Sequence, residues 1–310
     1  MEPHDSAQRP GSIRLIAGAD FRIKVVDIGA SAEDGSPPPY KGLLAIGDVD
    51  LVGFEPHAES LAALTLKKGP FETYLPHVIA DGARHTLNLC FGPGMTSLLT
   101  PNLPTLSLFH LFPIWAQIRA TEIVDTVRLD DVPETDGADF IKIDIQGAEL
   151  LALSHGLKRL RDVCIIQIEV NFVPMYVGQP LFSEIEQFLR HNGFMFHRFL
   201  DSEARMLRPM VIDDNPHGGM SQLVWADGIF VRDLARLDLY SDRQLLVAAT
   251  ILHDCYRSFD AALMLLFEYD ERNGTKVHRS YGALLRHHLP NRKFSLKRLK
   301  LADAPQPKLS

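Results

Sequence analysis

The sequence predicts an α/β protein with an open, doubly wound and mostly parallel sheet, and three carboxylates at strand ends carry this prediction. The segment DFIKIDIQGAELLAL predicts a buried strand that ends at Asp144 and turns through Gly147 into a helix beginning at Glu149. Two upstream strands end in the same way, at Asp27 in RIKVVDIGAS and at Glu55 in DVDLVGFEP. Ligands of such sheets bind at the carboxyl ends of the strands, so these acids are the first site candidates.

The first part of the chain alternates predicted strands with predicted helices, the pattern of βαβ units. Asp27 and Glu55 lie 28 residues apart, roughly one such unit. Pro56 stops the second strand, because a proline cannot donate to a ladder and suits the first turn of a helix. We expect helices at residues 40–46 and 58–68, and a third strand at residues 74–80.

The end of that third strand has two interpretations. Asp81 is either another acid at the ligand-binding edge or, with Gly82, the turn of a hairpin that leads into residues 85–89. Residues 92–120 then hold four prolines among several aromatic side chains. This irregular segment either covers the site or packs as a surface loop.

The second half of the chain predicts the rest of the sheet. An apolar run at residues 162–170 is typical of a central parallel strand and ends near Glu169 and Asn171. An amphipathic helix with one apolar stripe is expected at residues 180–192. The last two strands are expected at residues 194–199 and 224–231, paired antiparallel by analogy with related folds.

Beyond residue 232 the pattern becomes helical. Ser241 and Gln244 have the spacing of a capping box and begin a helix that runs to about residue 254. Two further helices follow, and the extension either packs on the sheet or forms a dimer surface. We therefore divide the chain into a disordered N-terminus (1–12), an α/β domain (13–232), a helical extension (233–290) and a basic, flexible tail (291–310).

The loop after the first strand indicates a cationic ligand. A dinucleotide site usually shows G-x-G-x-x-G at this point, whereas Gly29 is the one glycine in place and Glu33 and Asp34 would repel a phosphate. S-adenosylmethionine carries a sulfonium and an ammonium group and no phosphate, so the acidic loop favours it over NAD. A carboxylate such as Glu55 can accept hydrogen bonds from two ribose hydroxyls.

The ordered set of motifs resembles the FkbM family of S-adenosylmethionine-dependent methyltransferases over roughly residues 22–232. The resemblance implies a class I methyltransferase fold, which is Rossmann-like with a mostly parallel seven-stranded sheet, and methyl transfer to an oxygen of a sugar or small natural product. One departure is the first loop, which carries Ser36 and three prolines where the family often runs straight into a helix. The motifs are VVDIGAS, VGFEP, FGPGMTSLL, TVRLDDV, DFIKIDIQGAELLAL and QPLFSEIEQFLRHNGF.

Methyl transfer to a hydroxyl requires alignment of the reactants and a base for the hydroxyl proton. We select Asp144 as that base. Lys142 lies on the same strand face and is expected to pair with Asp27 or Asp144, which would keep the acid ionised. Glu149, at the positive end of the following helix, is either a third catalytic group or a plain helix-start acid.

The remaining candidates bind the two substrates of such a reaction. Glu169 and Asn171 either bind the acceptor hydroxyl or satisfy loop amides. The expected cofactor-binding residues are Asp27, Gly29, Ser31, Glu55, Pro56, Asp81 and Asp144. Strand-end carboxylates are also able to hold Mg²⁺, although nothing in the sequence requires it and no histidine pair has zinc-ligand spacing.

Composition limits the other classes. A net charge of −7 argues against a nucleic-acid binder, and no stretch reaches the roughly 18 apolar residues of a membrane span. Three widely spaced cysteines are expected to be reduced core thiols of a cytoplasmic protein. The expected partner is a small-molecule acceptor. Two alternatives remain at this point: an NAD-dependent oxidoreductase, and a methyltransferase-like binding protein without catalysis.

Overall fold

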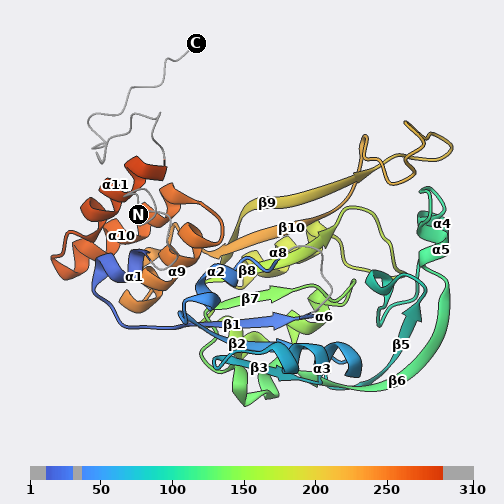
Figure 1. The fold of residues 1–310 in the computed structure, drawn as a ribbon, viewed down its shortest axis with the longest axis horizontal. Coiled ribbons are helices and arrows are strands. Elements are labelled where there is room, and N and C mark those ends of the chain that lie inside the picture. Colours follow the sequence, from blue (N-terminus) through green and yellow to red (C-terminus); the bar gives the residue numbers. More distant parts are fainter. Residues whose placement is uncertain (1–11, 31–36, 289–310) are drawn as a thin grey trace, which may run out of the picture.

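A mostly parallel sheet of seven strands forms the centre of the protein, whose computed structural model describes residues 12–30 and 37–288 (Figure 1). The strand order is β3-β2-β1-β7-β8-β10-β9, in which β10 is antiparallel to both of its neighbours. The reversal between β1 and β7 is the topological switch point at which ligands of such sheets bind. The bounds are β3 Glu72–Leu75, β2 Val49–Phe54, β1 Ile23–Ile28, β7 Phe140–Ile143, β8 Ile165–Asn171, β10 Gln222–Arg232 and β9 Phe194–Arg205.

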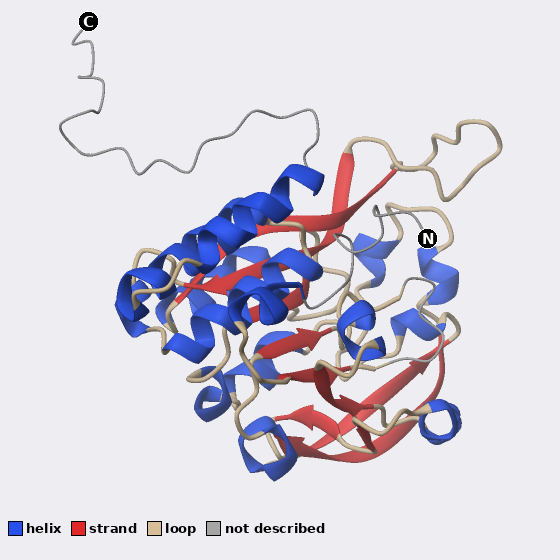
Figure 2. Ribbon diagram, turned by 60° about the vertical axis from the view of Figure 1, so that its left-hand side comes forward, coloured by secondary structure: helices blue, strands red, loops and turns tan. Residues whose placement is uncertain are grey.

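Helices cover both faces of this sheet (Figure 2). One face packs on the first and last helices of the chain: α1 Ser12–Ala17, α2 Lys41–Ala45, α9 Asp242–Asp254, α10 Phe259–Asn273 and α11 Val277–His288. The opposite face packs on α6 Glu149–Ser154, α7 Leu157–Leu160 and α8 Phe182–His191. At the sheet edge, α3 Ala58–Lys67 packs against β3.

The alternation of each strand divides its residues between the two cores. Val25 of β1 faces the core under α9, whereas Val26 and Ile28 face the core under α6 and α8. Asp27 shares the face of Val25, and in the strand register it lies beside Lys142 of β7, which lies beside Gln167 of β8. Polar residues therefore cross the sheet on the face that α9 to α11 cover.

A small second sheet, in the order β4-β6-β5, lies beyond the carboxyl ends of the parallel strands (Figure 1). The prediction of one strand at residues 74–80 is wrong, because Pro76 and His77 separate two strands that join different sheets. The hairpin reading also needs correction, since β6 lies between β4 and β5. The bounds are β4 Val78–Ala80, β5 Arg84–Cys90 and β6 Ile118–Arg128.

The irregular aromatic segment folds over this same end of the molecule. It contains α4 Leu103–Leu106 and α5 Phe112–Trp115 and surrounds a third apolar cluster that includes Phe109, Phe112 and Tyr176. The hairpin of β9 and β10 extends past it (Figures 1 and 2). Short 3₁₀ turns lie at Pro93–Met95, Leu129–Asp131, Pro133–Thr135 and Leu237–Leu239.

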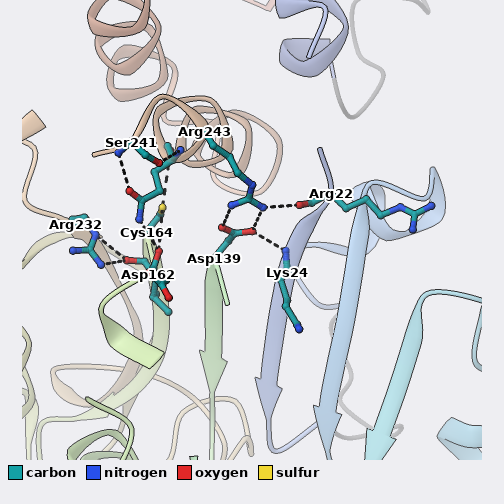
Figure 3. A network of polar contacts seen from close by, with 10 residues as sticks. Arg22, Lys24, Asp139, Asp162, Cys164, Arg232, Ser241 and Arg243 are labelled. Atoms are coloured by element: carbon teal, nitrogen blue, oxygen red, sulfur yellow. Dashed lines mark hydrogen bonds and ion pairs between the residues drawn. The ribbon is translucent and has the colours of Figure 1, made fainter. Parts of the chain in front are cut away.

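The helical extension packs on the sheet. Ser241 caps α9 in the predicted capping box, with Gln244 as its partner. Arg243 of α9 donates through both Nη atoms to Asp139, which also accepts from the Lys24 backbone N–H at 2.9 Å (Figure 3). This contact fastens α9 to the amino ends of β1 and β7. Whether the extension also forms a dimer stays a prediction.

Candidate active site

The loops after β1 and β7 cross in close contact at the switch point. Gly29 has a φ of +87°, and a Cβ atom on it would lie 2.1 Å from the Asp144 carbonyl oxygen. The Asp144 amide donates to the Ile28 carbonyl at 3.0 Å, so the two strand ends are tied by the backbone itself. Only a glycine fits here, because an added side chain would force Asp144 away from β1.

Asp27 and Lys142 form a buried ion pair just below this crossing. Lys142 Nζ lies 3.4 Å from Asp27 Oδ1, and the Tyr40 hydroxyl donates to Asp27 Oδ2 at 2.5 Å. Asp27 is thus one of the two carboxylates that the sequence offered as the lysine's partner. Burial and the neighbouring Asp27 raise the pKa of Tyr40 well above its usual value, so its hydroxyl keeps its proton and donates.

Glu55 lies at the end of β2, as predicted from its position before Pro56. Glu55 Oε1 accepts from the His57 backbone N–H at 2.7 Å, which holds the carboxylate at the start of α3. Gly53 lies two residues before Glu55, on the same face of the strand. A Cβ atom on Gly53 would lie 2.6 Å from the Tyr74 ring. Ser31 lies outside the described residues.

Asp144 begins the tight loop that connects β7 to α6, and Glu149 is the first residue of α6. Glu149 Oε1 accepts from the backbone N–H groups of Ile145 and Gly147, each at 3.0 Å, and the residue is only 1% exposed. Burial raises the pKa of Glu149 to about 7. Its position suits a residue that shapes the loop, and contact of Glu149 with a reacting atom remains a prediction.

Gln146 is a residue of this loop that the sequence did not single out. Its Nε2 donates to Asp144 Oδ1 at 2.7 Å, and its Oε1 accepts from the Tyr176 hydroxyl at 3.4 Å. Gln146 has a φ of +55°, a left-handed conformation that is uncommon for glutamine. Such strain recurs at functional sites, where the surrounding contacts hold it in place. The sequence signal, a glutamine between Asp144 and Gly147, is weak.

Glu169 and Asn171 end β8 beside the Asp144 loop. The pKa of Glu169 lies well above its usual range, because of burial first and then the negative charges of Asp144 and Glu149. Glu169 therefore holds its proton more tightly than an exposed glutamate does, and its protonated form is able to donate a hydrogen bond. Asn171 Nδ2 lies 3.5 Å from Glu169 Oε1, and its buried Oδ1 has no hydrogen-bond partner among the described residues.

Asp227 of β10 completes this group of acids and was not predicted. It lies opposite Glu169 in the antiparallel register, and its Oδ2 accepts from Gln167 Nε2 at 2.8 Å. The Tyr256 hydroxyl, which follows α9, donates to Gln167 Oε1 at 2.8 Å. Burial raises the pKa of Asp227 to about 6, and the charge of Asp144 adds to the effect.

Asp81 lies in the turn between β4 and β5, in the small sheet. Its Oδ1 accepts from the Ala83 backbone N–H at 2.9 Å and lies 2.8 Å from His85 Nε2. The backbone hydrogen bond is the main reason that the pKa of Asp81 falls to about 2. These contacts organise the turn, and an adenine contact for Asp81 stays a prediction.

A cavity of about 380 Å³ lies at the carboxyl edge of the sheet, where one of its lining residues, Gln146, is hydrogen-bonded to Asp144. Gln146 and Glu169 form its polar side, while the irregular aromatic segment, the β9–β10 hairpin and Met175 supply the rest. The sequence predicted that the aromatic segment covers a site or packs as a loop, and it lines this cavity. It gave no signal for Arg205 and Trp225 of the hairpin. The lining residues are Gly92, Gly94, Met95, Phe112, Trp115, Gln146, Glu169, Met175, Arg205 and Trp225.

Within residues 12–30 and 37–288, no three histidine, cysteine or acidic side chains come together in a group able to hold a metal ion. Among the described helices, none combines the length and the apolar character that a membrane crossing requires.

The strand order and the acids at the switch point define a class I methyltransferase fold. A sequence model of the methyltransferase FkbM domain matches residues 27–196, more than half of the 310 residues. The chain therefore belongs to the FkbM methyltransferase family, whose members depend on S-adenosylmethionine. No curated protein matches the chain in sequence.

Solved structures of methyltransferases show a distant likeness. The magnesium protoporphyrin IX methyltransferase of Synechocystis PCC 6803, solved with bound S-adenosylmethionine, is 11% identical, with 74% of this chain and 79% of that chain covered and a TM-score of 0.36. The 16S rRNA (adenine(1408)-N(1))-methyltransferase of Catenulisporales acidiphilia is 12% identical, with 72% and 91% covered and a TM-score of 0.33. Because these scores are low, we base the fold on the strand order and the family match.

Proposed function

We propose that this methyltransferase acts on a hydroxyl oxygen of a small molecule, either a sugar or a natural product. The observation that carries the proposal is the cavity of about 380 Å³ that meets the acidic strand ends at Gln146 and Glu169. A pocket of this size suits a small acceptor. Its polar side includes Gln146, the hydrogen-bond partner of Asp144, and Asp144 is our proposed base for the hydroxyl proton.

The residues at the switch point fit S-adenosylmethionine. Acids from successive strand ends suit a ligand with two cationic groups, and the close crossing of Gly29 and Asp144 brings the ends of β1 and β7 together. S-adenosylmethionine, when bound, supplies an activated methyl group whose bond to sulfur breaks as a bond to the acceptor oxygen forms. We expect it to be held by the set predicted from sequence: Asp27, Gly29, Ser31, Glu55, Pro56, Asp81 and Asp144.

The chain's own residues then have separate tasks. Asp144 accepts the acceptor's hydroxyl proton, while Gln146 orients its carboxylate through the 2.7 Å hydrogen bond. Glu169, with Asn171 behind it, binds the acceptor hydroxyl or a neighbouring oxygen. Lys142 is a positioning residue, because its ion pair with Asp27 holds that carboxylate in place. Mg²⁺ has no part in this scheme.

Family membership favours this function over an NAD-dependent oxidoreductase, because the matched family uses S-adenosylmethionine. A methyltransferase-like binding protein without catalysis remains as the second candidate. The free thiols of Cys90, Cys164 and Cys255 support the further proposal of a cytoplasmic location. A homodimer through residues 233–290 is a prediction that light scattering on the purified protein would test.

Two substitutions separate cofactor binding from catalysis. We expect Glu55→Ala to weaken binding of S-adenosylmethionine at least tenfold, because the ribose loses its charged acceptor. Asp144→Asn should leave that affinity within about threefold, because asparagine keeps an acceptor oxygen for the cofactor. It should lower turnover at least 100-fold, the usual contribution of a positioned base. Calorimetry measures the first quantity, and transfer of labelled methyl to a panel of hydroxyl acceptors measures the second.

Glu59→Ala is the matched control, since Glu59 is an exposed acid in the first turn of the adjacent helix α3. It should change neither quantity. Unchanged cofactor affinity in Glu55→Ala would contradict the placement of the ribose. Tight cofactor binding without methylation of any hydroxyl acceptor would favour the non-catalytic candidate.

A further inference from the structure

The walls of the cavity beside Asp144 are aromatic. Both tryptophans of the chain, Trp115 and Trp225, line it, and Phe112 lies between them with ring centroids 5.5 Å and 6.2 Å away. The three rings come from α5 and from β10, which are far apart in the sequence. Met95 and Met175 fill in around them. Flat aromatic ligands gain most from such walls, because offset stacking adds to the burial of apolar area.

The same cavity offers few polar partners. Its polar side chains are Gln146, Glu169 and Arg205, and Gln146 already bonds to Asp144 and Tyr176. A sugar also stacks on tryptophan, but it carries hydroxyls around its whole edge. Most of those hydroxyls would lose water here without gaining a hydrogen bond, which is costly. A ligand with one or two polar groups suits this lining better.

Arg205, which forms an ion pair with Glu203, brings a guanidinium group to one wall. Its guanidinium lies over the Trp225 ring at 4.9 Å from the centroid, and Nη1 donates to Glu203 and to the Ala204 carbonyl. Its buried Nε has no hydrogen-bond partner among the described residues. A buried guanidinium donor without a partner fits an anionic or carbonyl oxygen on a bound ligand.

We infer that the cavity binds a flat aromatic hydroxy acid, with its hydroxyl toward Glu169 and Asp144 and its anionic group at Arg205. The rings lie against Trp115, Phe112 and Trp225. This inference rests on the proposed function only where it names that ligand as the methyl acceptor. It narrows the acceptor from sugars and natural products in general to aromatic compounds with one acidic group.

The experiment uses three probes and the full chain: 6-hydroxy-2-naphthoate, 2-naphthol and methyl β-glucoside. Calorimetry gives each affinity, with S-adenosylhomocysteine present and absent. Tryptophan emission reports where the probe binds, because both tryptophans line this cavity. We expect saturable naphthoate binding with quenched emission, naphthol binding roughly tenfold weaker, and no saturable binding of the glucoside.

Three variants assign the binding to the cavity. Arg205→Met should lower naphthoate affinity about tenfold and remove its advantage over naphthol. Trp225→Leu should weaken both aromatic probes about fivefold, and Trp225→Phe should restore most of that loss. Arg236→Met, which removes an exposed arginine paired with Asp238, is the matched control and should change nothing. Thermal unfolding of each variant confirms that it is folded.

Several results would overturn the inference. These are tighter binding of the glucoside than of naphthoate, failure of both aromatic probes to bind, or an unchanged naphthoate preference in Arg205→Met. Labelled methyl transfer on the same probes tests the proposed function separately. Naphthoate that binds without being methylated counts against the function and leaves the binding inference standing. Methylation of a sugar without any binding of naphthoate would support the proposed function and contradict the binding inference.

Discussion

At the residue scale, Gly29 is the position where sequence and site depend most directly on each other. Gly29→Ala places a methyl group 2.1 Å from the Asp144 carbonyl oxygen on a backbone with φ of +87°. We expect a loss of about 2–4 kcal/mol in the free energy of unfolding, since the crossing loops must separate. Cofactor affinity should also fall. Urea denaturation and calorimetry measure the two effects.

Gly137→Ala is the matched control for that substitution. Gly137 has a similar φ of +70° but nothing within 4 Å of an added Cβ atom. It should therefore cost only the backbone penalty of about 1 kcal/mol and leave cofactor binding intact. Equal losses in the two variants would mean that the contact with Asp144 has no role in stability.

Glu149 makes the stability of the protein depend on pH. Burial raises its pKa in the folded protein from 4.5 to about 7, so the folded state holds the proton more tightly than the unfolded state. Its stabilising contribution is therefore full below pH 4.5 and is lost as the pH rises to about 7. The loss is on the order of 3 kcal/mol at most.

Glu149→Gln tests this dependence, because glutamine keeps an acceptor oxygen and cannot ionise. As the pH rises from 4.5 to 7, the wild type should lose stability relative to the variant, measured as the difference between their free energies of unfolding. Comparing the two proteins cancels the contribution of Asp227, whereas the charge of Glu149 also raises the pKa of Glu169, so that coupling is part of the measured difference. A difference that does not change with pH would show that folding does not raise the pKa of Glu149.

Residues of the candidate site were predictable from sequence only where a polar residue ends a run of apolar ones. Asp27, Glu55 and Asp144 stand out because each is an acid at the end of an apolar run. Arg205 and Trp225 sit in a long hairpin where polar and apolar residues are mixed, so nothing local marks them. Their place in the cavity depends on the register of β9 on β10, which shifts three times along the pair.

At the element scale, the central strands and the capped helices were predictable, and the peripheral strands were not. Val49–Phe54 and Ile165–Asn171 are buried along nearly their whole length, and their apolar runs mark them as central strands. Residues 72–80 are only partly buried, and the partner of each half decides its sheet. Partner choice is a long-range property, which a local pattern does not contain.

The N-terminus of α9 is fastened to the sheet by Arg243, whose loss should weaken the whole domain. The side chain of Asp139 is 2% exposed, whereas that of Arg243 is 48% exposed. Removing the arginine therefore leaves a buried carboxylate without its ion-pair partner. We expect Arg243→Met to lower the free energy of unfolding by about 2–4 kcal/mol, the lower value if water reaches Asp139. Chemical denaturation measures the change.

Two further variants test whether the loss comes from the contact between Arg243 and Asp139. Asp139→Asn in the Arg243→Met background should recover part of the loss, because the buried group is then neutral. Arg236→Met removes an arginine from a solvent-exposed pair and should have little effect. A similar loss in both arginine variants would argue that the contact with Asp139 is not special.

At the scale of the whole molecule, the methyltransferase sheet and the helical extension have one core. Val25 of β1, Phe140 of β7 and Ile229 of β10 lie in the same buried cluster as Leu245, Leu252 and Leu265 of α9 and α10. Nine residues of α9 are buried. The extension therefore replaces solvent over one face of the sheet, and the polar row through Asp27 and Gln167 lies beneath it.

This shared core predicts a single cooperative unfolding transition. Truncation after Arg232 would expose the face of the sheet that α9 and α10 cover, including Val25 and Phe140. It would also leave Asp139 without Arg243 and Gln167 without Tyr256. Since the lost burial exceeds the 5–15 kcal/mol that holds a typical domain folded, we expect the truncated chain to aggregate or to lack fixed tertiary structure. Calorimetry of the full chain should show one peak whose calorimetric and van't Hoff enthalpies agree. Two separable peaks would show that the extension unfolds independently of the sheet. A soluble truncated chain that binds S-adenosylmethionine would show the same.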